Sequence, residues 1–231
     1  MPEIPSSIMI FAAGFGTRMM PLTRDRPKPM VRVAGEPMID RALFLTSDAG
    51  ISNVVSNLHY KADVLEAHLH GRGVTILREE PDILDTGGGL KNALSLLGSD
   101  PVLTMNPDAI WNGPNPLTFA QSHWKPDQMD ALLVCVSPEN ALGSNNTGDF
   151  TLDESGLISR GSDALYGGVQ IIKTERLKEI SNKVFSLNQL WDLLIEDSRC
   201  FGQFYPGKWC DVGHPGGISI AEEMIGWQSN D

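Results

Sequence analysis

The chain has 231 residues, of which 18 are Lys or Arg and 29 are Asp or Glu, so its formal net charge is −11. This acidity excludes non-specific nucleic-acid binding, which needs a basic surface, but not a small phosphorylated ligand in a local basic pocket. An apolar content of 41% with 20% charged residues is typical of a soluble globular protein. The length predicts a single domain over residues 1–231.

Three cysteines, Cys135, Cys200 and Cys210, form no CxxC pair. Their odd number does not suit a disulfide framework and favours a reducing compartment. The first apolar run, from Ile8 to Ala13, is too short for a membrane span or a signal segment, and no Lys or Arg precedes it. We therefore expect a cytoplasmic protein that binds neither nucleic acid nor a membrane.

Strands and helices alternate in the first half of the chain. A continuous apolar run at Ile8–Ala12 predicts a strand that is covered on both faces, and a Gly- and Pro-rich loop follows from Gly14 to Pro29. Three helices then alternate with three strands, at Met38–Ala49, Asn53–Asn57, Lys61–Leu69, Val74–Leu77, Gly89–Leu97 and Val102–Met105. This rhythm predicts a mostly parallel, helix-covered sheet with right-handed crossovers.

The second half of the chain is more mixed. We predict strands at Ala131–Val136 and Tyr166–Ile172, and a hairpin that joins Phe150–Leu152 to Leu157–Ser159. Helices are expected at Leu187–Glu196 and Ile218–Ile225, and loops at Trp111–Pro116 and Asn140–Gly148. Short strands thus form an insertion after the fourth strand of one α/β domain.

The loop after the first strand combines glycines with basic residues. Gly14 and Gly16 would let backbone N–H groups approach a phosphate without interference from a Cβ atom. Four of the 18 basic residues fall within eleven positions there: Arg18, Arg24, Arg26 and Lys28. This concentration favours a polyphosphate-binding site, and a tight turn with solvated arginines is the structural alternative.

Two common phosphate-binding motifs do not match this loop. A dinucleotide-binding fingerprint needs a third glycine where Met19 stands. A P-loop needs Ser or Thr after its Gly-Lys pair, and Gly207-Lys208 is followed by Trp209.

The motifs Gly14-x-Gly-Thr-Arg18, Pro21-Leu-Thr23 and Pro27-Lys-Pro29 resemble the N-terminal signature of the sugar-1-phosphate nucleotidylyltransferases, the NDP-sugar pyrophosphorylases. The similarity extends over nearly the whole chain, through Asp85–Gly89, Asn106–Asp108, Tyr166–Val169 and Trp209–Gly213. It implies an α/β fold of the nucleotide-diphospho-sugar transferase type, a three-layer α/β/α sandwich with a mixed, mostly parallel, Rossmann-like sheet. Residues 1–110 would form the nucleotide-binding half, and residues 111–231 the sugar-phosphate-binding half.

The resemblance implies a Mg²⁺-dependent transfer of a nucleotidyl group from an NTP to a sugar 1-phosphate, with release of pyrophosphate. The sugar phosphate oxygen attacks the α-phosphorus in line, so catalysis consists mostly of positioning and charge neutralisation. Similarity to the short members that act on N-acetylmuramate 1-phosphate implies UTP and that sugar phosphate as substrates, and a role in peptidoglycan recycling.

The resemblance also implies roles for individual residues. It gives catalytic roles to Arg18, Lys28 and Asp108, and assigns Mg²⁺ to Asp108 and Asp211, since hard oxygen ligands and a triphosphate suit this ion. Without the motifs, either aspartate would more often be a cap or turn residue. Nucleotide contacts are expected from Ala13, Gly14, Gly16, Thr17, Arg18, Lys28, Glu80 and Gly87. Sugar-phosphate contacts are expected from Asn106, Asp149 and Gly168.

One position departs from the family pattern. Pro107 stands where the family usually has glycine, and proline fixes φ at about −65° and removes an N–H. A catalytically silent nucleotide-sugar-binding protein is therefore one alternative, and a mannose-1-phosphate guanylyltransferase is another. The chain has no room for the C-terminal β-helix of the larger family members, so we expect a monomer or a homodimer.

Overall fold

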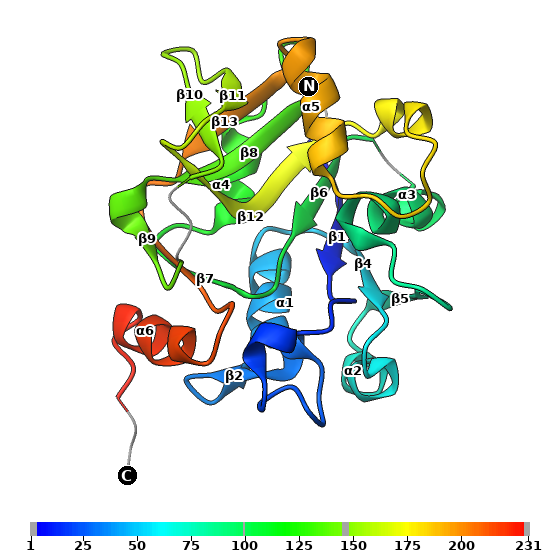
Figure 1. Ribbon diagram of the computed structural model, residues 1–231, viewed down its shortest axis with the longest axis vertical. Helices are drawn as coiled ribbons and strands as arrows, with labels where there is room; N and C mark the ends of the chain where they lie inside the picture. The colour runs from blue at the N-terminus through cyan, green and yellow to red at the C-terminus, as the bar shows by residue number, and fades with distance from the viewer. Residues whose placement is uncertain (1–3, 99, 145–147, 229–231) are drawn as a thin grey trace.

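A seven-stranded sheet runs through the centre of the computed structural model, which describes residues 4–98, 100–144 and 148–228 (Figure 1). The strand order is β13 (Cys200–Phe204), β8 (Ala131–Val136), β12 (Leu165–Ile172), β6 (Val102–Met105), β1 (Ser7–Phe11), β4 (Asn53–Leu58) and β5 (Val74–Arg78). Strand β12 runs antiparallel to β6 and β8, and the other neighbouring pairs are parallel. The prediction of a mixed, mostly parallel sheet is therefore confirmed.

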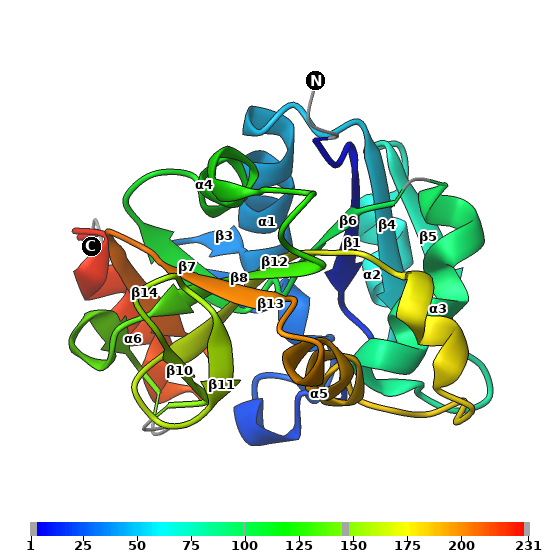
Figure 2. The ribbon, with the colours of Figure 1, turned by 90° about the horizontal axis from the view of Figure 1, so that it is seen from above.

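Helices cover both faces of this sheet (Figure 2). On one face, Ile8 and Ile10 of β1 join a core cluster with α1 (Met38–Asp48), α2 (Ala62–Leu69) and α4 (Pro116–His123). On the other face, Met9 joins a cluster with α3 (Asp85–Leu97) and α5 (Asn188–Glu196). Alternate residues of β1 thus point into different cores, as expected of a strand buried on both faces. The result is the predicted three-layer α/β/α sandwich.

Smaller sheets and a terminal helix flank the sandwich. Strands β7 (Ala109–Asn112), β14 (Lys208–Asp211) and β9 (Ala141–Leu142) form one sheet, and α6 (Gly216–Met224) packs on it. Strands β10 (Phe150–Leu152) and β11 (Ile158–Arg160) form the predicted hairpin, while β2 (Arg32–Val33) pairs with β3 (Glu36–Pro37). The 3₁₀ helices are η1 (Thr17–Met19), η2 (Lys28–Met30), η3 (Pro138–Asn140) and η4 (Glu175–Glu179).

Helix α3 begins at Asp85 and not at Gly89, so the predicted start was wrong. Three successive glycines are poor helix formers, so the apolar periodicity predicts a helix that begins only at the last of them. Tertiary contacts override this preference, because the N–H groups of Gly87 and Gly88 both donate to the Phe185 carbonyl, at 2.9 and 3.0 Å. A Cβ atom at Gly88 would lie 2.4 Å from the Lys183 carbonyl oxygen, so this close packing requires glycine.

The predicted loop at Trp111–Pro116 was also wrong at both ends. Residues Ala109–Asn112 form β7, and Pro116 is the first residue of α4. Asn115 is the N-cap, and its side-chain oxygen accepts a hydrogen bond from the Leu117 N–H at 2.9 Å. The predicted loop at Asn140–Gly148 contains the short strand β9, and its residues 145–147 lie outside the described part of the chain.

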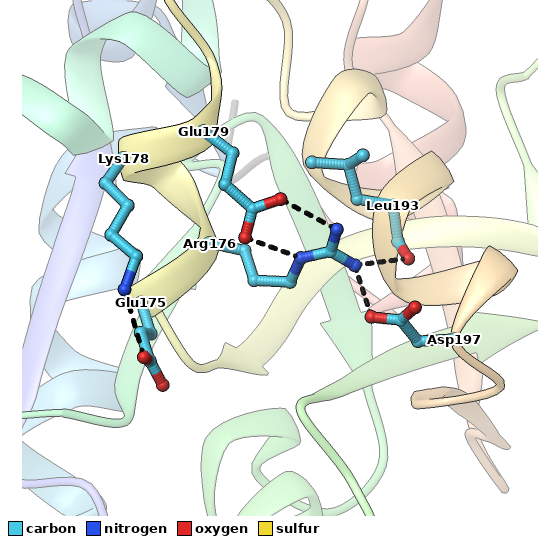
Figure 3. Close-up of polar contacts among 6 residues, drawn as sticks. All are labelled: Glu175, Arg176, Lys178, Glu179, Leu193 and Asp197. Carbon is cyan, nitrogen blue, oxygen red and sulfur yellow. Dashed lines mark hydrogen bonds and ion pairs between the residues drawn. The ribbon is translucent and has the colours of Figure 1, made fainter.

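A surface cluster around Arg176 ties η4 to α5 (Figure 3). The Arg176 guanidinium donates to the Glu179 carboxylate at 2.8 and 3.0 Å, to the Leu193 carbonyl at 2.9 Å, and to Asp197. Hydrogen bonding to Arg176 lowers the pKa of Glu179. We call Arg176, Glu179 and Asp197 the surface ion cluster.

The three cysteines are free, as the sequence predicted, and all three are buried. Burial raises the pKa of the Cys200 and Cys210 thiols to about 12, and it also raises the pKa of Cys135. None of the helices in residues 4–98, 100–144 and 148–228 has the length and apolar character that crossing a membrane would require.

Candidate functional site

The loops that follow β1 and β6 meet at one cleft. These two strands are parallel neighbours, so the segments at their carboxyl ends emerge at the same edge of the sheet. A cavity of about 340 Å³ lies there. It brings together residues that the sequence analysis had singled out from distant segments, Arg18, Asn106, Asp108, Asp149, Gly168 and Asp211.

Two further cavities share walls with this one. A cavity of about 220 Å³ is lined by Ala13, Gly14, Asn57, Asp85 and Thr86, together with Asn106 and Asp108. Another, of about 280 Å³, is lined by residues that include Asn106, Asp149, Tyr166 and Trp191. Because Asn106 lines all three, they are adjoining parts of one cleft. We call the part beside Ala13 and Thr86 the nucleotide-side cavity, because the sequence analysis expects nucleotide contacts from Ala13 and Gly14, which line it.

The glycine loop has a defined internal structure. Gly16 has a φ of 62°, and a Cβ atom there would lie 3.0 Å from Lys28 Cβ, so the position favours glycine. The Thr23 hydroxyl donates to the Gly16 carbonyl at 2.8 Å, and the Tyr60 hydroxyl donates to the Thr23 carbonyl at 2.9 Å. Thr17 is exposed at the start of η1. The loop is therefore anchored to the residues after β4 by side-chain hydrogen bonds.

Lys28 and Asp108 form an ion pair across the cleft. Lys28 Nζ donates to Asp108 Oδ2 at 2.5 Å, and the two side chains are 15% and 28% exposed. Lys28 sits in η2 between Pro27 and Pro29, and both prolines are buried. The pair places a cationic nitrogen and a carboxylate at the edge of the same cavity system, where a phosphate could exchange for the carboxylate.

Asp211 lies close to Asp108 although 103 positions separate them in the sequence. Strand β14 pairs antiparallel with β7, and the Val212 N–H donates to the Asp108 carbonyl at 3.0 Å. Burial, followed by the Asp108 charge, raises the pKa of Asp211, while Lys28, Arg18 and His214 oppose this shift. The two carboxylates thus form an acidic pair in one cavity.

This donor set fits a magnesium ion. Within the described residues, no group of three or more His, Cys, Asp or Glu side chains could hold a metal ion. Mg²⁺ in nucleotide sites is usually held by one or two carboxylates, with phosphate and water oxygens completing its shell. Asp108 and Asp211 supply that number of carboxylates beside the cavity into which phosphates would enter.

The three residues expected to contact the sugar phosphate lie together. The Asn106 N–H donates to the Gly168 carbonyl at 2.8 Å, and Gly168 has a φ of 91°. A Cβ atom at Gly168 would lie 3.0 Å from Asn106 Cβ, so glycine is required for this approach. Asp149 Oδ2 accepts a hydrogen bond from the Tyr166 N–H at 2.9 Å.

Four of the expected nucleotide contacts are not among the lining residues of these cavities: Gly16, Thr17, Glu80 and Gly87. Glu80 is exposed, and the buried carboxylate is that of its neighbour Glu79. Gly87 is buried, and its N–H already donates to the Phe185 carbonyl. Asp85 and Thr86 line the nucleotide-side cavity in its place.

Sequence reasoning missed Asn57, Tyr166 and Trp191 as lining residues. A usable signal existed for Asn57, because it is the last residue of the strand predicted at Asn53–Asn57, in a sheet predicted to be mostly parallel. Polar residues at such strand ends converge on the same edge. Trp191 had no such signal, since it lies on a helix whose apolar face the pattern assigns to the core.

Comparisons with known proteins agree with this geometry. A family model described as nucleotidyl transferase matches residues 7–160. The chain is 40% identical to the N-acetylmuramate alpha-1-phosphate uridylyltransferase of Caulobacter vibrioides, over 97% of this chain and 99% of that protein. It is 32% identical to the enzyme of the same name from Neisseria meningitidis, over 94% of this chain and 97% of that protein.

A solved structure shows the same fold. A UDP-glucose pyrophosphorylase complexed with UDP-glucose superposes with a TM-score of 0.76 at 17% identity, over 94% of this chain and 97% of that one. The fold is thus that of the nucleotide-diphospho-sugar transferases. The family match, the two relatives and the assembled motifs agree: the chain belongs to the nucleotidyl transferase family and is a nucleotidyltransferase of the sugar-1-phosphate type.

Proposed function

We propose that this chain transfers a uridylyl group from UTP to N-acetylmuramate α-1-phosphate and releases pyrophosphate, with Mg²⁺ as cofactor. The observation that carries the proposal is the meeting of Lys28, Asp108 and Asp211 at the carboxyl ends of the strands. The choice of UTP and of the sugar follows the two relatives, which cover nearly the whole chain.

The chain's own residues have separate tasks in this reaction. The Lys28 ammonium, now paired with Asp108, neutralises charge at the α-phosphate when the nucleotide enters. Arg18 lines the larger cavity and stabilises the charge that develops on the leaving pyrophosphate. Asp108 and Asp211 would hold Mg²⁺, which supplies further charge neutralisation at the phosphates when bound.

Substrate positioning divides between the two halves of one domain. The nucleotide occupies the cavity lined by Ala13, Gly14 and Thr86, which lie in residues 1–110. The sugar phosphate lies beside Asn106, Asp149 and Gly168, mostly in residues 111–231. Tyr166 and Trp191, whose ring centroids are 4.9 Å apart, form an aromatic wall that can pack against a sugar ring and keep water out.

A substrate panel tests this proposal. Pyrophosphate release is measured with each of four NTPs against N-acetylmuramate, N-acetylglucosamine, glucose and mannose 1-phosphates, with Mg²⁺ or with EDTA. We expect the largest kcat/KM for UTP with N-acetylmuramate 1-phosphate, and no turnover in EDTA. A preference for GTP with mannose 1-phosphate would identify a guanylyltransferase. UTP binding without turnover of any pair would identify a silent binding protein, and recovery in Pro107→Gly would trace the silence to that proline.

A further inference from the structure

A buried polar pair lies behind the nucleotide-side cavity. Asn57 is 3% exposed in β4, and Glu79 is 1% exposed directly after β5. Asn57 Nδ2 donates to Glu79 Oε1 at 2.7 Å. Fully buried acidic residues are rare unless they have polar partners, and the Glu79 carboxylate accepts hydrogen bonds from the Asn57 side chain and the Leu84 N–H.

The pair connects two segments that border the cavity. Asn57 Oδ1 accepts a hydrogen bond from the Ala12 N–H at 2.9 Å, two residues before Gly14. Glu79 Oε2 accepts a hydrogen bond from the Leu84 N–H at 2.8 Å, directly before Asp85 and the first turn of α3. One continuous series of hydrogen bonds therefore links Ala12, just before the glycine loop, to Leu84, just before α3.

Each donor and acceptor in this series of hydrogen bonds can be oriented in only one way. A carboxylate only accepts hydrogen bonds, so the amide nitrogen of Asn57 must face Glu79, and the amide oxygen must face the Ala12 N–H. Both backbone N–H groups would otherwise be buried without a partner. The arrangement has one consistent solution and holds both segments at fixed distances.

Helix α3 is shaped to admit the pair. A Cβ atom at Gly89 would lie 2.8 Å from Glu79 Oε1 and 2.9 Å from Asn57 Nδ2. The third glycine of the Asp85–Gly89 segment is therefore required by Glu79 and Asn57. His59 adds a further anchor, because its Nδ1 lies 2.8 Å from the Glu79 carbonyl oxygen.

We propose that the Asn57–Glu79 pair positions the two walls of the nucleotide-side cavity, so that the glycine loop and the Asp85–Thr86 turn are correctly spaced before the nucleotide binds. Glu79 is a positioning residue and acts through Asn57 and Leu84. Asn57 itself lines the cavity. The inference rests on the proposed function, because it assumes that a nucleotide occupies this cavity.

A reciprocal exchange tests the pair. In Glu79→Gln the new amide must turn an N–H toward either Asn57 Nδ2 or the Leu84 N–H, so two donors face each other. In Asn57→Asp two carboxylates face each other. In the double variant the new amide donates to the new carboxylate and accepts from the Leu84 N–H, while the carboxylate still accepts from the Ala12 N–H. All the original partners are then satisfied again.

The readouts are the UTP dissociation constant by calorimetry, the separate KM values for UTP and the sugar phosphate, and the melting temperature. Asp130→Asn is the matched control, because it disrupts a half-buried carboxylate near the start of β8. Each single exchange at the pair should weaken UTP binding about tenfold, as expected for one buried donor or acceptor left unsatisfied. The KM for the sugar phosphate should change less than about threefold, and the double variant should return to within about threefold of the wild-type UTP affinity.

Three results would overturn the proposal. The first is a single variant that melts earlier but binds UTP as the wild type does, which would make the pair purely structural. The second is a double variant no better than the worse single variant. The third, should both single variants fail to fold, is a double variant that also fails to fold. Failure of the wild-type chain to bind any NTP would instead refute the proposed function.

Discussion

Two groups of charged residues in this molecule use the same chemistry for different ends. The proposed catalytic centre contains Lys28, Asp108 and Asp211, and the surface ion cluster contains Arg176, Glu179 and Asp197. In the surface cluster, hydrogen bonding lowers the pKa of Glu179, so the fold itself satisfies the charge. In the proposed catalytic centre, burial first and then the Asp108 charge raise the pKa of Asp211, so this carboxyl group ionises less readily than an exposed one.

This difference in pKa direction separates a cluster that stabilises the fold from one that is suited to bind a ligand. A satisfied ion pair at the surface contributes little free energy and needs no ligand. Carboxylates held close together inside a cavity are unfavourable until a cation arrives, and perturbed groups of this kind concentrate where proteins bind and react. The direction of a pKa shift thus distinguishes the two clusters better than their residue types do.

The largest expected effect is that of removing the Lys28 ammonium group from the proposed catalytic centre. Lys28→Ala should lower kcat by about 10³-fold, because in the proposed reaction the ammonium stabilises charge that develops at the phosphates. The melting temperature should change by only a few degrees, since Asp108 can be hydrated in the cleft. Lys178→Ala, at an exposed lysine that pairs with Glu175, is the matched control and should leave kcat unchanged. Equal losses of kcat in both variants would remove the contrast between centre and surface.

The contribution of Asp211 to the proposed catalytic centre should be measurable in the dependence of activity on Mg²⁺. Asp211→Asn should raise the Mg²⁺ concentration needed for half-maximal activity by about tenfold or more, because one of the two proposed carboxylate ligands is lost. Titration of activity with Mg²⁺, at saturating substrates, measures this shift. An unchanged Mg²⁺ requirement would show that Asp211 does not hold the ion.

Asp130 provides an intermediate case, a satisfied cluster inside the fold. It accepts hydrogen bonds from Lys173 at 2.8 Å and from Arg199 at 2.9 Å. Burial opposes its ionisation, but the hydrogen bonds from Arg199 and Lys173 outweigh burial and lower its pKa. Its contribution to stability is therefore complete above the unfolded-state pKa of about 4 and is lost as the pH falls through the lower folded-state value.

Asp130→Asn should accordingly lower the free energy of unfolding by about 1 kcal/mol at pH 7, and by less at pH 3. Urea unfolding at both pH values measures the difference, with nucleotide affinity as the control that should not move. A destabilisation of the same size at both pH values would contradict the role of the ionised carboxylate.

The smallest effect is expected at the surface ion cluster. Arg176→Ala should lower the melting temperature by no more than about 2 °C, because exposed ion pairs contribute little, and high salt should reduce even this difference. Kinetic constants should be unchanged. A loss of several degrees, or any change in kcat, would mean that the junction of η4 and α5 supports the cleft after all.

Most of the alternating strands and helices could be predicted from the sequence, because their apolar residues follow the periodicity of each element. The apolar run at Ala131–Val136 is buried throughout, and its strand has the predicted bounds. Helix α4 was missed although Asn115 and Pro116 are a typical helix start. Helix α3 was shortened because the contacts that hold its glycines come from Lys183 and Phe185, about a hundred residues away.

The candidate site shows the same limit. Motifs singled out Lys28, Asp108 and Asp211, and the fold brings all three to the cleft system. A motif could not choose between Glu79 and Glu80, because only the contacts with Asn57 and Leu84 distinguish these neighbours. Local patterns specify which residue types are present, while long-range contacts decide which of two adjacent side chains turns inward.

The three buried thiols have a consequence for measurement. A thiolate is the reactive form of cysteine, and burial keeps Cys135, Cys200 and Cys210 protonated and covered in the folded chain. Chemical labelling can therefore occur only through openings of the structure. Cys135 and Cys200 belong to the cluster beneath α3 and α5, whereas Cys210 belongs to the one beside α6. The labelling rates of Cys135 and Cys200 would thus report the opening of the central sheet. The labelling rate of Cys210 would report the detachment of the C-terminal helix.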